Sequence, residues 1–278
     1  MYATRPASPS RPAWRHAFLL FAVPVATASA AGEARAQAQS QEGGDWQVMV
    51  GAGAIYTPDY EGSDDHDLLP FPAISISYRD LFYVRGPELG VNLVRLKPSD
   101  DLKINIGPMA RFRRDRPEDR NADLKGLGDV DLAIEVGGAL AIEYGNAFLR
   151  VSGGKDVAGG HDGVVVEGEA GLRFNLAERL NASVSARTSW ADRKYMSSYF
   201  SVSPTQSAAS GLPVYRAEGG IKDVGAGLNL NYQLSRHWVV SAIGGYSRLL
   251  NDAKDAPLVR LRGSDDQWTG GLFLAYRF

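Results

Sequence analysis

Few side chains in this sequence could do acid–base or nucleophilic chemistry. Of its four histidines, His66, His161 and His237 lie beyond the N-terminal segment. A serine hydrolase would need one of them beside a strand serine and an acid. Neither the Gly-x-Ser-x-Gly turn of such hydrolases nor the His-Glu-x-x-His zinc motif is present. We therefore predict that the protein is not an enzyme and has neither catalytic residues nor a cofactor, and we expect His66 and His161 in solvated loops.

One acidic run has the composition of a cation site. The segment Asp64-Asp65-His66-Asp67 could hold a divalent cation through oxygen ligands and bridge it to lipopolysaccharide phosphates. A solvated loop explains the same run, and we predict no metal site. The chain has no cysteine, which excludes disulfides, thiolate metal sites and cysteine catalysis.

A larger set of charged residues alternates with apolar ones. Within residues 102–113, 130–144 and 164–176, apolar side chains occupy every second position, as in a β-strand with one apolar face. In a membrane barrel the polar face lines the lumen and tunes selectivity. Opposite charges on neighbouring strands could equally pair and close a small barrel. The candidate lumen residues are Lys103, Arg111, Arg113, Asp131, Glu135, Glu167, Glu169 and Arg173.

The last strand carries a second signal. From Trp268 to Phe278 aromatic residues stand at both ends of an alternating apolar face, and the segment has about the 9–11 residues that a tilted strand needs to cross a bilayer. It resembles the C-terminal strand of bacterial outer-membrane barrels. That resemblance makes Tyr276 and Phe278 an assembly signal read by the barrel-assembly machinery. An edge strand of a soluble sandwich is the alternative.

Alternation recurs about a dozen times along the chain. The other predicted strands are 46–56, 71–78, 81–85, 89–94, 102–113, 130–144, 147–153, 164–176, 180–190, 224–234 and 238–246. Short links alternate with mostly long ones, as periplasmic turns alternate with extracellular loops in outer-membrane barrels. We predict an all-β fold, a transmembrane antiparallel up-and-down β-barrel of about 12 strands, whose closure leaves no sheet edge in lipid.

The N-terminus predicts export. A basic region is followed by the apolar segment 17–25, which is too short to span a membrane as a helix, and then by small residues. We predict a signal peptide over residues 1–38, with an alternative end at 30, and a barrel over 39–278. The predicted location is the outer membrane of a Gram-negative bacterium, in contact with its lipid and lipopolysaccharide.

Composition agrees with this location. The formal net charge is −2 and the isoelectric point about 6.1, which argues against a nucleic-acid partner. The mean hydropathy of −0.21 suits a barrel, because each lipid-facing residue is followed by a lumen-facing polar one.

Several sequence blocks resemble the MipA/OmpV family, the MltA-interacting protein family. They occur in order over essentially the whole mature chain, and Ser201 departs from the glycine expected in its block. The blocks are Thr57-Pro58-Asp59-Tyr60-Glu61-Gly62-Ser63, Leu69-Pro70-Phe71-Pro72, residues 195–223, Leu249-Leu250-Asn251-Asp252-Ala253 with Ala256-Pro257, and Tyr276-Arg277-Phe278.

The resemblance implies a non-enzymatic scaffold that links a lytic murein transglycosylase to a penicillin-binding protein. Other members of the family are associated with osmotic response, antibiotic uptake and adhesion, so a porin-like uptake or binding role for small polar solutes is the alternative. The resemblance supplies no functional residue motif, and it leaves the solute, the partner and the oligomeric state open.

The long loop 191–220 is rich in aromatic residues. Its aromatic side chains suit a plug or a ligand site inside the barrel, or a lid held by its own aromatic cluster. They are Tyr195, Tyr199, Phe200 and Tyr215.

Overall fold

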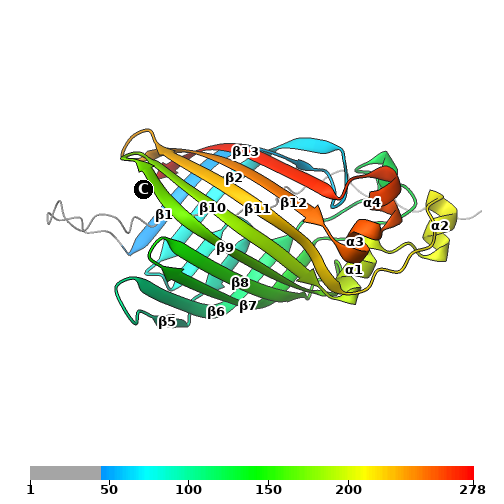
Figure 1. Cartoon of the computed structure of the whole chain (residues 1–278), viewed down its shortest axis with the longest axis horizontal. Helices are drawn as coiled ribbons and strands as arrows, with labels where there is room; N and C mark the ends of the chain where they lie inside the picture. The colour runs from blue at the N-terminus through cyan, green and yellow to red at the C-terminus, as the bar shows by residue number, and fades with distance from the viewer. Residues whose placement is uncertain (1–44) are drawn as a thin grey trace, which may run out of the picture.

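A computed structural model describes residues 45–278, which form a closed antiparallel β-barrel with a helical cap at one end (Figure 1). Thirteen strand segments follow one another in sequence order around the wall, and pairing of β4 with β6 closes the ring. Both β4 and β5 pair with β6 and together fill one position in the wall. The barrel therefore has twelve strands, and the fold predicted from the sequence is confirmed. The predicted signal peptide lies outside the described residues.

Strand lengths range from three residues to fourteen. The bounds are β1 (Trp46–Pro58), β2 (His66–Tyr78), β3 (Phe82–Arg85), β4 (Glu88–Val91), β5 (Val94–Leu96), β6 (Leu102–Arg113), β7 (Ala133–Tyr144), β8 (Ala147–Asp156), β9 (Val164–Ala177), β10 (Leu180–Ala191), β11 (Gly220–Gln233), β12 (Trp238–Leu249) and β13 (Asp266–Arg277).

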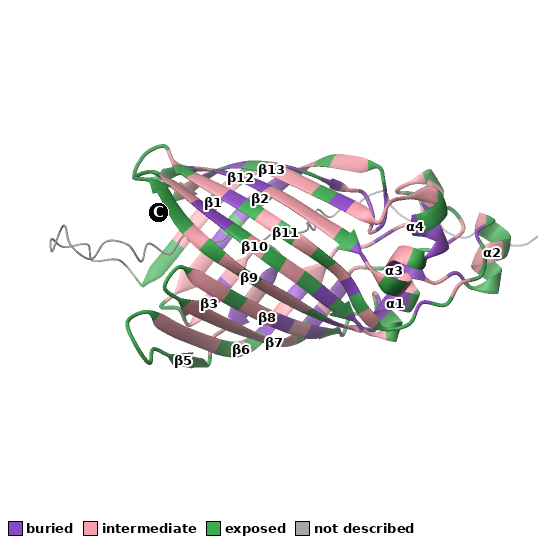
Figure 2. Ribbon diagram, viewed as in Figure 1, coloured by how far each residue is buried: buried purple, intermediate pink, exposed green. Residues whose placement is uncertain are grey.

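Side chains along each strand alternate between two environments, because successive residues of a pleated strand point to opposite faces. In β1, Val50 and Tyr56 are exposed on the outer wall while Ile55 and Thr57 are buried inside. Figure 2 shows this alternation as bands around the wall. The apolar outer face can therefore contact lipid while the polar residues turn inward.

The wall is incomplete at one place. The four-residue strand β3 pairs only with Ser75–Tyr78 of β2. Within the described part of the chain, residues 66–73 of β2 consequently pair with β1 alone. The expectation that closure leaves no sheet edge is wrong here. Pro70 and Pro72 lie on this edge, where a residue without an N–H is tolerated.

The two ends of the barrel differ. Both chain ends of the described region and the short turns lie at one end, and all helices lie at the other (Figure 1). The helices are η1 (Ala122–Leu124), α1 (Arg193–Phe200), α2 (Pro204–Ser210), α3 (Asn251–Asp255) and α4 (Pro257–Arg262). No helix within residues 45–278 has the length and apolar composition needed to cross a membrane.

Local sequence explains why the predicted loop 191–220 is partly helical. Asp192 accepts a hydrogen bond from the Tyr195 backbone N–H and so caps α1. In α2, Ser203 and Gln206 form a reciprocal capping box. Ser201 ends α1 at a φ of −78°, which needs no glycine, and its Oγ accepts a hydrogen bond from the Ala217 N–H. Serine therefore fits the backbone at this position and adds a side-chain contact that glycine could not make.

The core of the protein sits in the cap as well as in the barrel. One apolar cluster joins α1 and α3 to the barrel rim and includes Tyr195, Phe200 and Leu249. A second joins η1 to α4 through Leu124 and Leu258. Full burial of each such side chain contributes about 1.5–3 kcal/mol. The cap is therefore a packed element, held over the barrel mouth by its own core.

Candidate functional site: the charged lumen and its cap

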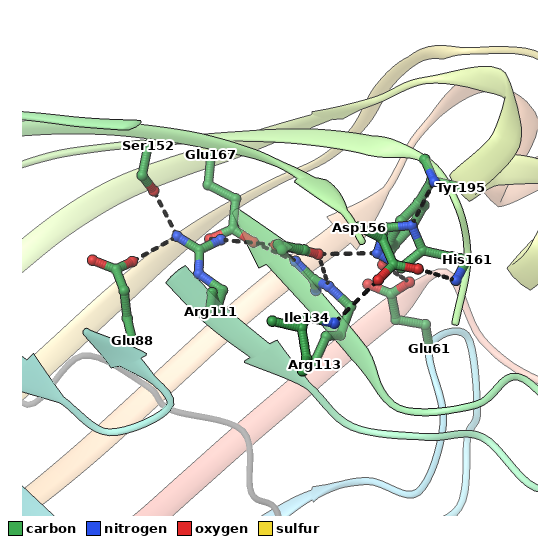
Figure 3. Close-up of polar contacts among 12 residues, drawn as sticks. Glu61, Glu88, Arg111, Arg113, Ile134, Ser152, Asp156, His161, Glu167 and Tyr195 are labelled. Atoms are coloured by element: carbon green, nitrogen blue, oxygen red, sulfur yellow. Dashed lines mark hydrogen bonds and ion pairs between the residues drawn. The ribbon is translucent and has the colours of Figure 1, made fainter. Parts of the chain in front are cut away.

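Three arginines and three glutamates meet inside the barrel, roughly below the cap. Arg111, on β6, donates a hydrogen bond to Glu88 at 2.8 Å and one to the Ser152 hydroxyl at 2.6 Å. It also forms an ion pair with Glu167 on β9 at 2.7 Å. Arg150, on β8, pairs with Glu88 and donates a hydrogen bond to the Tyr83 hydroxyl. Arg111 and Glu88 stand opposite each other on the paired strands β6 and β4, whereas the contacts of Arg111 with Ser152 and Glu167 reach strands that are not its neighbours in the wall (Figure 3).

The upper half of this network reaches the loop between β8 and β9. Arg113 donates hydrogen bonds to Glu135 at 2.6 Å and to Glu167 at 2.9 Å. Glu135 has no exposed surface, and its carboxylate lies 3.1 Å from His161 Nε2. Asp156 accepts hydrogen bonds from the backbone N–H groups of Ala158, His161 and Asp162. The loop is thus folded around a carboxylate and fixes the imidazole against the lumen network.

A β-bulge places two charged residues side by side on the inner face. The register between β10 and β11 shifts at Ser189, so that Lys222 and the next residue, Asp223, both contribute to the lumen. Lys222 pairs with Asp223 at 2.7 Å and also with Glu61 from the loop after β1. The Tyr195 hydroxyl donates a hydrogen bond to the same Glu61 at 2.9 Å. Glu61 therefore ties the first loop and the cap to the barrel wall.

The predicted aromatic residues of the cap pack against this polar lumen. The ring of Tyr195 lies 4.6 Å from that of Tyr199 and 4.8 Å from that of His161, and Arg113 stacks on it at 5.4 Å. Burial and the nearby Glu61 hold the pKa of Tyr195 well above its usual range. Phe200 is buried in the same cluster and Tyr215 is partly buried beside it. This is the arrangement of a lid held by its own aromatic cluster, and ligand binding by these residues remains a hypothesis.

A cavity of about 310 Å³ lies inside the barrel beside the ion pairs. Its lining combines apolar residues from β1 and β12, such as Ile55 and Leu249, with charged residues from β3, β6 and β8–β11. Phe112, on β6, also lines the cavity. It lies just beyond the last residue of β6 that pairs with β4, where the short β3–β4 hairpin ends. The cavity can therefore hold a small molecule between fixed charges.

The structure places the predicted lumen residues unevenly. Arg111, Arg113, Glu135 and Glu167 meet in one network, and Arg173 pairs with Glu143 at 3.0 Å near the turn end. Glu169 lines the cavity. Lys103 stands opposite Glu143 in the β6–β7 register.

Two predictions about these positions are wrong. Asp131 is exposed and precedes β7, which begins at Ala133 rather than Val130, because Val130 instead bridges Arg116. Asp131 therefore does not line the lumen. His161 is 2% exposed instead of solvated, because Asp156 folds its loop inward.

The remaining predicted positions lie at the two ends of the barrel. Asp65 of the acidic run accepts a hydrogen bond from Asn121, and residues 45–278 hold no group of three or more potential metal ligands. At the turn end, Tyr276 stacks on His237 at 5.3 Å and meets Phe278 edge-on at 4.9 Å. Phe278 itself is 76% exposed. Its side chain is thus accessible, as a recognition signal requires.

Sequence reasoning missed several residues that organise the lumen. Glu88 and Arg150 had alternating neighbours that could have identified them as inward-facing. Lys222 could not be found from alternation, because the bulge reverses the pattern at that point. Glu61 lies in a loop, and only the folded cap brings it to the lumen.

The family model described as MltA-interacting protein MipA matches residues 50–278. The chain belongs to the MipA family. The chain is similar to YiaT of Escherichia coli (strain K12), named as an outer membrane protein, which is 24% identical over 88% of this chain and 92% of its own. The MltA-interacting protein of the same strain is 26% identical over 90% of this chain and 94% of its own.

Solved outer-membrane barrels resemble this MipA-family chain at low identity. An outer membrane channel from Pseudomonas putida F1 is 13% identical, with a TM-score of 0.46 over 86% of this chain and all of its own. OmpT of Vibrio cholerae is 10% identical, with a TM-score of 0.37 over 84% of this chain and 97% of its own. The family membership and the closed barrel identify this protein as a MipA-family barrel of the outer membrane. In such barrels the short turns face the periplasm.

Proposed function

We propose that this protein is a non-enzymatic scaffold in the outer membrane, whose periplasmic end docks a lytic murein transglycosylase and links it to a penicillin-binding protein. The observation that carries the proposal is the likeness to the MltA-interacting protein, which extends over 90% of this chain. A likeness of that extent includes the periplasmic turns as well as the barrel wall.

The geometry supports a platform more than an open channel. Ion pairs cross the lumen, and a packed cap covers the extracellular mouth. The turn end is left uncovered by helices and carries exposed residues, including the turn Lys97–Asp101 between β5 and β6. A partner in the periplasm would therefore meet a rigid rim of short turns.

A pull-down from solubilised membranes tests this function. We expect the affinity-tagged, full-length barrel to recover a transglycosylase and a penicillin-binding protein. Replacing Lys97–Asp101 by a Gly-Ser turn should reduce recovery, whereas deleting residues 192–219 of the extracellular cap should leave recovery unchanged. Recovery of neither enzyme by the wild-type protein would refute the scaffold.

The cavity supports a second candidate function. A charged space of about 310 Å³ inside the barrel suits binding or uptake of a small polar solute or antibiotic, including during osmotic stress. Single-channel recordings in planar bilayers test it. We expect little current from the intact protein and a measurable current after deletion of residues 192–219, because the cap covers the mouth. Absence of current in both proteins would remove the pore.

A further inference from the structure

The charges around the luminal cavity do not balance. Seven basic and five acidic side chains line it, an excess of two positive charges. Four of the basic side chains, Arg111, Arg113, Arg150 and Lys222, are held by acidic partners. The excess positive charge therefore lies on the other three basic side chains of the lining.

Three arginines of the lining form no ion pair within residues 45–278. They are Arg85 on β3, Arg187 on β10 and Arg114 just beyond β6. Arg114 Nη1 is in addition buried with no hydrogen-bond partner in the described part of the chain. Among the acidic lining residues, Glu169 alone forms no ion pair with any other residue of the described region, although it stands opposite Arg187 in the β9–β10 register.

An arginine in this position cannot become neutral, because the guanidinium keeps its proton at any physiological pH. Its five N–H donors are otherwise left to water in a partly enclosed space. A planar oxyanion satisfies two of them at once in a bidentate pair. We propose that the luminal cavity is a binding site for a small organic carboxylate, held by Arg85 and Arg187. This proposal rests on the second candidate function and names the class of its solute.

Arg85 is held in place by an aromatic face. Its guanidinium carbon lies 5.2 Å from the centre of the Tyr83 ring, and the guanidinium carbon of Arg150 lies 5.4 Å from the same ring. Arg150 is paired with Glu88, which also accepts the Tyr83 hydroxyl hydrogen bond at 3.0 Å. The ring is therefore fixed, and stacking positions Arg85 while leaving its N–H groups for a ligand.

The side chain of Arg187 occupies space that Gly245 of β12 leaves free. A Cβ atom built on Gly245 of β12 would lie 2.8 Å from Arg187 Nη2. The guanidinium thus reaches across β11 and lies over a glycine of the barrel wall. A methyl group at this position would displace only the end of a flexible side chain, so Gly245→Ala should shift Arg187 without disturbing the strand.

The ligand is small and carries a hydrogen-bond donor. The cavity volume of about 310 Å³ is at the lower end of the range for small-molecule sites, about 300–1,000 Å³. Glu169 lies in the same cavity and can accept a hydrogen bond from a hydroxyl group. Hydroxylated acids with few carbon atoms, such as L-malate, fit both requirements.

Titration calorimetry of the full-length protein, purified in detergent, tests the site with L-malate as the probe. We expect malate to bind and its uncharged diamide to bind at least about tenfold more weakly, since hydrogen bonds to charged groups are the strong ones. Arg85→Gln and Arg187→Gln should each weaken malate binding about tenfold or more. Gly245→Ala should weaken it in the same direction. Arg179→Gln, an exposed arginine in a periplasmic turn, is the matched control and should bind as the wild type does.

Equal binding of malate and its diamide would overturn the site, as would unchanged binding in both arginine variants. Heat-dependent gel mobility shows whether each variant is folded, and Gly245→Ala keeps the test decisive if an arginine variant misfolds. The assay is separate from conductance. Malate binding without current in either the intact or the cap-deleted protein would support the site and refute the pore, whereas current without malate binding would refute the site alone.

Discussion

Removal of Glu135 tests whether the luminal ion pairs hold the barrel together. Its carboxylate is fully buried and contacts both Arg113 and His161. Glu135→Ala would leave the guanidinium and the imidazole in a space with little water. Breaking a buried ion pair by removal of one partner typically costs about 3–5 kcal/mol. Arg113 keeps its second partner, Glu167, so we expect Glu135→Ala to lower the free energy of unfolding by about 3 kcal/mol, the lower end of this range.

Glu143 supplies a matched control on the same strand and the same inner face. It pairs with Arg173 at 3.0 Å, but both side chains are more than a quarter exposed. Exposed pairs contribute about 0–1 kcal/mol, and Glu143→Ala should therefore change stability by no more than that. Glu135→Gln keeps the size of the side chain and removes its charge, and we expect a loss between those of the two alanine variants.

Urea-induced unfolding in lipid vesicles, followed by tryptophan fluorescence, measures these differences. The three variants should have the same m-value, because the surface exposed on unfolding is nearly unchanged. They should differ only in the urea concentration at the midpoint of unfolding. If Glu135→Ala and Glu143→Ala proved equally stable, the buried luminal ion pairs would not stabilise the barrel.

Three further predictions concern the ends of the barrel. Phe278→Ala should lower the amount of assembled barrel in membranes, measured by heat-dependent gel mobility, and unchanged assembly would show that the terminal ring is not the signal. Tyr195→Phe removes the hydrogen bond to the carboxylate of Glu61, which should destabilise the cap by about 1.5 kcal/mol, the lower end for a hydrogen bond to a charged group, and speed proteolysis within it; equal cleavage rates would contradict this. Burial alone would raise the pKa of Asp265, but its hydrogen bond and ion pair with Arg248 lower it below 3.8. The stability that Asp265 contributes is therefore complete above about pH 4 and is lost as the pH falls further. The Leu249 backbone N–H donates a hydrogen bond to the Asp265 carbonyl oxygen, and its protection from hydrogen exchange should decrease only below about pH 4.

Most of the barrel could be predicted from the sequence because its strands obey a local rule. Alternation depends only on the pleat, and it located all twelve strands with errors of a few residues at their ends. The weakest pattern, around residues 81–94, corresponds to the shortest strands, where the structure also leaves Pro70 and Pro72 on an unpaired edge.

The functional contacts were harder to predict because they join positions far apart in the sequence. Glu61 meets Lys222 and Tyr195 only after the cap has packed on the rim. The bulge at Ser189 breaks the alternation that would have identified Lys222. Asp131 followed the alternation but lies in a loop, since the bridge between Arg116 and Val130 ends the regular pairing. Helices of five to eight residues have too few turns for a clear period.

The most direct test of the scaffold measures binding of a purified lytic transglycosylase to the barrel reconstituted in lipid nanodiscs. We predict saturable binding that persists after deletion of residues 192–219 and weakens when the turn Lys97–Asp101 is replaced. Absence of binding to the intact barrel, or binding that depends on the extracellular cap alone, would contradict a periplasmic docking function.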